Sequence, residues 1–245
     1  MRKVLLMIGI ILLGQAYPLW AQEKDSCKVT VDVTADVVSS YIWRGLVSDL
    51  KPNIQPSVAL GIGNFEAGIW GSSNFDNTYR EVDYWLAYSY KSFTLTFNDY
   101  CWSPYLDKGK YFNWNNSSTC HYLELQLDWE GPEKFPVKCT AATFIHGLDK
   151  KFNDDDTLKG GDLKNNYSTY FEVSYPFQLK NTEINVFAGG TPAEGFYADK
   201  AALINVGISA KKQLAITEQY SLPLTGSLVV NPHEEQVYFV FMITL

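Results

Sequence analysis

The most regular feature of the chain is an alternation of apolar and polar residues within segments of about ten residues. A period of two is typical of β-strands with one apolar and one polar face. In residues 29–46, for example, valines occupy odd positions of the first half, and Asp32 and Asp36 fall on the other face. Twelve such segments can be counted, at about 29–46, 53–62, 64–74, 79–90, 92–102, 119–130, 137–147, 166–178, 181–190, 200–210, 217–230 and 235–245.

The connections between these segments alternate between tight turns and longer polar loops. The longest loops are residues 103–118 and the polar stretch after His146. This alternation is typical of outer-membrane barrels, with short periplasmic turns and long extracellular loops. A sheet in hydrocarbon must also close on itself, because unpaired backbone groups are costly there. The pattern predicts an all-β, single-domain antiparallel transmembrane β-barrel of about twelve strands over residues 22–245. Ten or fourteen strands are the alternatives, since 217–230 is interrupted by Pro223.

Both ends of the chain favour export to a bacterial outer membrane. Residues 1–21 have the layout of a cleaved signal peptide, with Arg2 and Lys3 before an apolar run and small residues ending at Ala21. The final segment resembles the assembly signal of outer-membrane barrels, with Leu245 in place of the usual aromatic residue. We therefore expect membrane lipid and the barrel-assembly machinery as partners, with both termini on the periplasmic side.

Composition narrows the class of protein further. Removal of the signal peptide leaves 18 Lys and Arg against 27 Asp and Glu, a net charge of about −9 by subtraction, which excludes nucleic acid as a partner. Aromatic residues make up 15% of the chain and cluster near segment ends, as in the interfacial girdles of membrane barrels. A soluble β-sandwich is the alternative, and the loops, the aromatic residues and the export signal all oppose it.

Strand parity predicts that one side of the wall carries most of the acidic residues. Ten charged side chains are expected to face the lumen, namely Asp32, Asp36, Glu66, Glu81, Asp83, Glu124, Asp128, Glu172, Glu183 and Arg44. Such an interior has two interpretations. A water-filled acidic bore would favour cations, because charge rings set the selectivity of pores. A plug of hydrogen-bonded polar side chains would instead fill the interior.

Arg44 is the one positive charge among these inward positions. Its planar fork suits paired contacts with a carboxylate, and Glu81 and Asp83 are the expected partners. We expect it to brace an acidic interior rather than to contact a solute. Tyr41 and Trp43 are expected to face outward as belt anchors, before a first outer loop at 47–52.

The first strands carry a set of residues that is moderately specific. It comprises Tyr41, Trp43, Arg44 and Gly45, then Pro52 and Gln55, then 68–72 and 81–84. With these residues the chain resembles the TorF-type family of outer-membrane porins, bacterial proteins of largely unassigned function. The resemblance covers about a third of the mature chain. It implies a small outer-membrane barrel of the porin type and brings no established substrate.

Four cysteines in an oxidising compartment suggest disulfides, with three possible connectivities. Cys101 and Cys120 flank the long loop at 103–118, and their pairing is preferred. Cys27 and Cys139 would then pair by default or remain free. None of the four has the spacing of a zinc or redox motif.

Histidines raise the possibility of an enzyme. His121 lies near Ser117 and Ser118 and would be the first residue to mutate in a lipid-modifying hydrolase. Neighbours in sequence do not make a catalytic triad, which needs hydrogen-bond geometry. The acidic residues Asp154, Asp155, Asp156 and Asp162 lack the spacing of a calcium loop and are expected to form a solvated surface.

The sequence therefore predicts a small porin that passes small polar or cationic solutes, without catalytic residues, cofactor or metal. A lipid-modifying hydrolase of the outer membrane is one alternative. A non-conducting structural or surface-binding barrel is the other.

Overall fold

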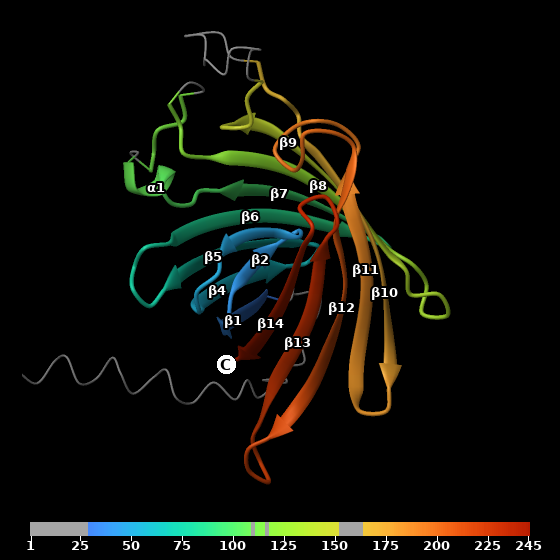
Figure 1. The fold of residues 1–245 in the computed structure, drawn as a ribbon. Coiled ribbons are helices and arrows are strands. Elements are labelled where there is room, and N and C mark those ends of the chain that lie inside the picture. Colours follow the sequence, from blue (N-terminus) through green and yellow to red (C-terminus); the bar gives the residue numbers. More distant parts are fainter. Residues whose placement is uncertain (1–28, 109–110, 116–117, 152–163) are drawn as a thin grey trace, which may run out of the picture.

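Residues 29–108, 111–115, 118–151 and 164–245 are described by a computed structural model (Figure 1). Twelve strands form one closed antiparallel barrel in the order β1-β14-β13-β12-β11-β10-β9-β8-β7-β6-β5-β4. The predicted all-β antiparallel barrel and its number of strands are therefore confirmed. The predicted signal peptide, Cys27, Ser117 and the acidic residues at 154–156 and 162 lie outside the described residues. In the described part of the chain, no helix is long and apolar enough to cross a membrane.

The strand boundaries follow the predicted segments closely over most of the chain. The barrel strands are β1 (Val29–Val38), β4 (Asn53–Ile62), β5 (Phe65–Asn74), β6 (Arg80–Tyr90), β7 (Phe93–Tyr100), β8 (Tyr122–Glu130), β9 (Lys138–Gly147), β10 (Thr169–Leu179), β11 (Thr182–Thr191), β12 (Ala202–Ala215), β13 (Ser221–Asn231) and β14 (Gln236–Thr244). A single helical turn, α1 (Tyr105–Lys108), lies in the connection from β7 to β8. Strand β12 runs five residues beyond the predicted end at 210, and Pro223 lies inside β13 opposite Gln213.

Tight turns lie at one end of the barrel and the long connections lie at the other. The two-residue turns after β4, β6 and β10 begin with Gly63, Lys91 and Lys180, and each of these residues has a positive φ. Positive φ at this position is typical of the primed turns that match the twist of a hairpin. The connections after β7 and β9 are the longest and belong to the opposite end. This end is called the loop end below, and the other the turn end.

The outer wall of the barrel is apolar. Alternate side chains of each strand point outward and remain exposed, including Val31, Leu60, Phe65, Leu86, Leu95, Leu127, Val173, Phe177, Val237 and Phe239. Their neighbours in sequence, such as Gln55 and Asp83, point inward and are buried. The predicted alternation thus separates an apolar exterior from a mostly polar interior.

The first predicted strand, at 29–46, is wrong in its second half. The barrel strand β1 ends at Val38, and the chain then forms a separate hairpin of β2 (Tyr41–Trp43) and β3 (Leu46–Asp49). Arg44 and Gly45 form its turn with φ of 51° and 79°. Positive φ at both central residues is the type I′ geometry, which suits a two-residue hairpin.

This hairpin, called the inner hairpin below, extends into the barrel instead of forming an outer loop (Figure 1). The Trp43 ring lies 5.5 Å from that of Tyr100 and 6.5 Å from that of Phe144, centroid to centroid. The backbone oxygen of Gly45 accepts a hydrogen bond from Asn231 on the opposite wall, at 3.1 Å. The expected outward orientation of Tyr41 and Trp43 is therefore wrong, because both side chains of the hairpin pack against aromatic residues of the inner wall.

An aromatic cluster fills the interior toward the loop end. Its buried members are Tyr122, Phe144, Tyr170, Tyr197, Ala198 and Ile204, and Trp43, Leu46, Tyr100, Trp102 and Phe196 pack against them. Tyr197 and Phe196 come from the connection between β11 and β12. The core of the protein therefore lies inside the barrel, around the tip of the inner hairpin.

Candidate functional site inside the barrel

Arg44 lies at the tip of the inner hairpin and binds Glu124 of β8 with both arms of its guanidinium. Its Nη1 is 2.5 Å from Glu124 Oε2, and its Nη2 is 3.0 Å from Glu124 Oε1. The Glu124 side chain is fully buried and that of Arg44 is 10% exposed. The predicted partners Glu81 and Asp83 are therefore wrong. The turn geometry of the hairpin, which sequence parity did not reveal, directs the guanidinium to β8 instead of β6.

The remaining donors and acceptors of this ion pair are also occupied. Arg44 donates to Gln126 at 3.0 Å and to Tyr197 at 2.6 Å, and the Tyr100 hydroxyl donates to Glu124 at 2.9 Å. The guanidinium carbon lies 4.5 Å from the ring centroid of Trp43. Stacking on an aromatic face suits the planar, weakly hydrated guanidinium. This network attaches the inner hairpin to β8 and to the connection that carries Tyr197.

Other predicted lumen acids are held by neutral donors. Glu172 accepts hydrogen bonds from the Tyr170 hydroxyl at 2.5 Å and from Asn205 at 2.8 Å. Asp128 accepts from Thr140 at 2.6 Å. Because these donors carry no charge, the interior keeps a negative balance at these positions.

Three more of the predicted acids are spread along the wall. Asp36 accepts a hydrogen bond from Thr244 at 2.6 Å, and Glu66 accepts one from the Trp85 indole at 2.9 Å. Asp32 is exposed near the start of β1. Parity therefore predicted which face these residues occupy, but the structure does not gather them into one ring.

Glu81 and Asp83 form a second buried acidic site, two residues apart on β6. Their exposed fractions are 5% and 7%. The Tyr79 hydroxyl donates to Glu81 at 2.5 Å, and the backbone N–H of Cys101 donates to Asp83 at 3.2 Å. Within the described residues, neither carboxylate forms an ion pair with a lysine or arginine.

Two cavities lie on different sides of the hairpin tip. One of about 220 Å³ is lined by residues that include Trp43, Glu81 and Trp102. The other, of about 310 Å³, is lined by polar wall residues together with Arg44 and Glu172. Among the described residues, none lines both cavities. Trp43 lines the first cavity and Arg44 lines the second, so the tip of the inner hairpin borders both.

A buried loop contact positions one wall of the first cavity. Asp149, after β9, accepts hydrogen bonds from the backbone and hydroxyl of Ser168 at 2.8 and 2.6 Å. The same hydroxyl accepts from the backbone N–H of Phe196 at 2.8 Å. Burial raises the pKa of the Asp149 carboxyl above its usual value. Two long connections are thereby held together beside the aromatic cluster.

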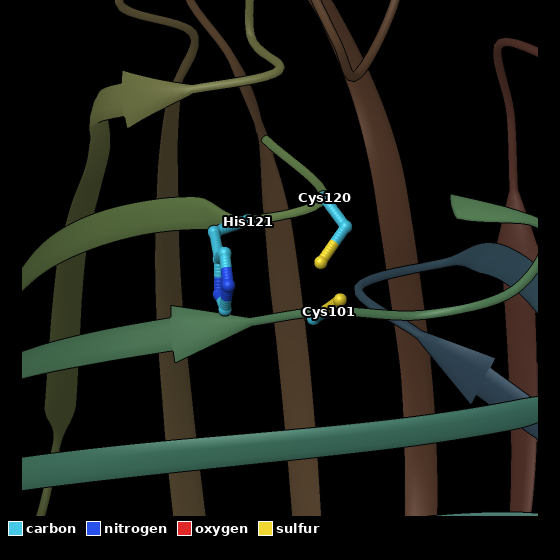
Figure 2. Close-up of side chains that lie close together, drawn as sticks. All are labelled: Cys101, Cys120 and His121. Atoms are coloured by element: carbon cyan, nitrogen blue, oxygen red, sulfur yellow. The ribbon is translucent and has the colours of Figure 1, made fainter. Parts of the chain in front are cut away.

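Cys101, Cys120 and His121 lie close together where the β7–β8 connection leaves the barrel (Figure 2). The two sulfur atoms and one ring nitrogen lie within 4.8 Å of one another, and all three residues are buried. The structure thus brings the predicted cysteine pair together, but both residues are free thiols, as is Cys139. Formation of the disulfide remains a prediction, which mass spectrometry of the non-reduced protein would test by the loss of two hydrogens.

His121 is oriented by contacts at both ring nitrogens. Nδ1 lies 2.7 Å from a carboxylate oxygen of Asp99, Nε2 lies 2.5 Å from the backbone oxygen of Tyr111, and the Trp114 ring stacks on the imidazole at 4.0 Å. Two thiols and an imidazole are ligands that zinc uses, but a metal would have to displace one of these oxygens. In the described part of the chain no serine contacts His121; Ser118 is bonded to Asn113 instead.

Sequence reasoning missed the inner hairpin and therefore the residues that surround Arg44. Gln126, Tyr197 and the inward Trp43 carry no motif that would mark them. One signal was present, since a glycine-containing pair between two short apolar stretches can form a two-residue turn. That signal is the pair Arg44-Gly45 between 41–43 and 46–47.

The structural class of the protein follows from these observations. The described residues form a closed twelve-stranded antiparallel barrel with a hairpin inserted into its interior. The chain matches no protein-family model, and a search of curated proteins finds no relative.

Proposed function

We propose that the protein is an outer-membrane barrel of the porin class, in which the inner hairpin closes a passage for small polar or cationic solutes. The observation that carries the proposal is the position of Arg44. It lies at the tip of a hairpin inside the barrel, is bound through both arms to Glu124, and lines one of the two cavities that border this tip.

The outer wall supports a membrane location. Water-soluble proteins rarely expose apolar patches larger than a few hundred Å², whereas this barrel exposes apolar side chains on many of its strands. Tight turns at one end and long connections at the other are the arrangement of outer-membrane barrels. The predicted signal peptide and the resemblance to TorF-type porins point in the same direction.

The charge of the interior supports a preference for cations. Glu172, Asp128 and Glu66 are bound by neutral donors, so their charges remain available to a permeating ion. Carboxylates that line a pore favour the passage of cations. A solute that crosses would have to pass the hairpin tip, which lies inside the barrel and borders both cavities.

Planar-bilayer recording tests the proposal. The wild-type protein is expected to give small, infrequent openings with cation selectivity. A variant in which residues 41–49 are replaced by a short glycine-serine linker should conduct continuously, and Arg44→Ala should open more often than the wild type. Lys51→Ala, outside the lumen, is the matched control. Absence of current from the hairpin-deleted variant after verified insertion would contradict porin function.

A non-conducting, surface-binding barrel is the second candidate, and the filled aromatic interior at the loop end favours it. The same recording separates the two functions. The hydrolase alternative has no comparable support, because both ring nitrogens of the buried His121 already contact oxygen atoms. The hydrolase alternative would gain support if the purified wild type hydrolysed phospholipid and the His121→Ala variant did not.

A further inference from the structure

The smaller of the two cavities combines aromatic walls with an acidic side chain. It measures about 220 Å³ and is lined by residues that include Trp43, Tyr79, Glu81, Tyr100, Trp102 and Phe196. We propose that this cavity binds a small organic cation, a primary or quaternary ammonium compound. This inference goes beyond solute passage and does not depend on it.

The walls have the composition of an aromatic cage. The ring of Trp43 lies 5.5 Å from that of Tyr100 and 6.1 Å from that of Phe196, and the ring of Trp102 lies 5.9 Å from that of Phe196. With Tyr79, five aromatic side chains thus line the cavity. Ammonium groups are attracted to the negative faces of such rings, most strongly when the cation is desolvated.

The acidic side chain of the cavity has no ion pair with a lysine or arginine among the described residues. Glu81 is 5% exposed, and Asp83 lies two residues further along the same face of β6. Tyr79 donates a hydrogen bond to Glu81, but in the described chain no lysine or arginine is paired with it. Arg44 is already bound to Glu124. Burial of an unpaired carboxylate is costly, so a ligand that brings a positive charge would offset that cost.

Chemistry and size favour an organic cation over a metal ion. Calcium and magnesium require six or more oxygen ligands, whereas the rings that line this cavity offer mainly apolar surface. Pockets for drug-sized ligands measure roughly 300–1,000 Å³, so this cavity suits a smaller molecule. A neutral apolar molecule of the same shape would leave the Glu81 carboxylate without a cationic partner.

The cavity lies toward the loop end, which gives a ligand a route to it. Leu46, Val47 and Ser48 of the inner hairpin line one side, and Ser103 of the β7–β8 connection lines another. A bound cation would contact both the hairpin and the barrel wall. Occupancy is therefore expected to raise the stability of the hairpin inside the barrel.

Ligand titration of the purified full-length protein in detergent tests the proposal, with the quenching of tryptophan fluorescence as the readout. Tetramethylammonium and choline are the probes, and 3,3-dimethylbutanol is the neutral molecule with nearly the shape of choline. We expect saturable quenching by both cations and at least tenfold weaker binding of the alcohol. Equal binding of choline and the alcohol, or no saturable quenching, would overturn the proposal.

Glu81→Gln should weaken the binding of choline at least tenfold and leave that of the alcohol unchanged. Glu66→Gln is the matched control, since it removes a lumen carboxylate that contacts Trp85 and does not line the cavity. Phe196→Leu keeps the carboxylate and removes one ring, so it should also weaken choline binding. Wild-type affinity in both Glu81→Gln and Phe196→Leu would overturn the assignment. Because no step requires conduction, a failure here is distinguishable from a failure of the porin proposal.

Discussion

Two buried acidic sites on the same inner wall differ in how their charge is balanced. Glu124 on β8 is paired with both arms of Arg44, whereas Glu81 and Asp83 on β6 receive only hydrogen bonds from neutral groups. All three side chains are almost fully buried. The difference shows that the reach of the inner hairpin, and not the number of acids on a strand, decides which site holds a protein cation. The first site is then suited to fasten a segment, and the second to receive a positive ligand.

The largest expected effect comes from removing the cation of the paired site. Arg44→Leu leaves Glu124 buried without its partner, and breaking a buried pair in this way typically costs about 3–5 kcal/mol. Urea unfolding in detergent micelles, followed by tryptophan fluorescence, would measure the change in the free energy of unfolding. Combining Arg44→Leu with Glu124→Gln should recover part of the loss. A loss below about 1 kcal/mol, the range of exposed pairs, would contradict the importance of this pair.

The turn that directs Arg44 to β8 gives the next effect. Gly45 has a φ of 79°, and a Cβ at this position would lie 1.9 Å from the backbone oxygen of Ile204. Gly45→Ala should therefore lower the free energy of unfolding by more than the roughly 1–2 kcal/mol that a left-handed backbone conformation costs a non-glycine residue. It should also displace the hairpin tip. Gly226→Ala is the matched control, because its Cβ would meet only Phe241 at 3.8 Å. Equal unfolding midpoints for the two variants would show that the tip is not tightly held.

Removing the carboxylate of the site without a protein cation should not destabilise the protein, in contrast to the variants above. Glu81→Gln removes a buried carboxylate that has no cationic partner and lies near Asp83, so the free energy of unfolding should stay the same or rise by about 1 kcal/mol when no ligand is added. Glu124→Gln, by contrast, should lower it. Unfolding both variants under one set of conditions compares the two sites directly. A large loss in Glu81→Gln would mean that its carboxylate is required for folding.

An exposed ion pair at the loop end provides the smallest effect and a lower reference. Lys51 Nζ lies 2.5 Å from Asp76 Oδ2, and this hydrogen bond, followed by that from Thr78, lowers the pKa of Asp76. A lowered pKa contributes stability above the unfolded-state pKa, and that contribution is lost as pH falls through the folded-state value. Asp76→Asn should therefore slightly reduce the loss of unfolding free energy that occurs as the pH falls from neutral to about 3. An effect as large as that of Arg44→Leu would remove the distinction between buried and exposed pairs.

Much of the barrel could be predicted because strand periodicity is a local property. Exposed Val31 and Leu127 and buried Glu81 and Glu124 all occupy the predicted faces. The hairpin at 41–49 could not be predicted by the same rule, because its own alternation continues that of β1. Whether such a segment extends the wall or folds inward depends on the space inside the closed barrel.

The sequence by itself determined an all-β barrel, the number of its strands and the face on which each acid lies, because these follow from a two-residue period and from the alternation of turns and loops. Only the tertiary structure decided that Arg44 binds Glu124 and that Trp43 faces inward. Those contacts join residues 80 and 101 positions apart, and they depend on closure of the barrel and on the direction of one turn. The physical reason is that local patterning orients side chains relative to their own strand, whereas partners across the interior are set by the shape of the whole barrel.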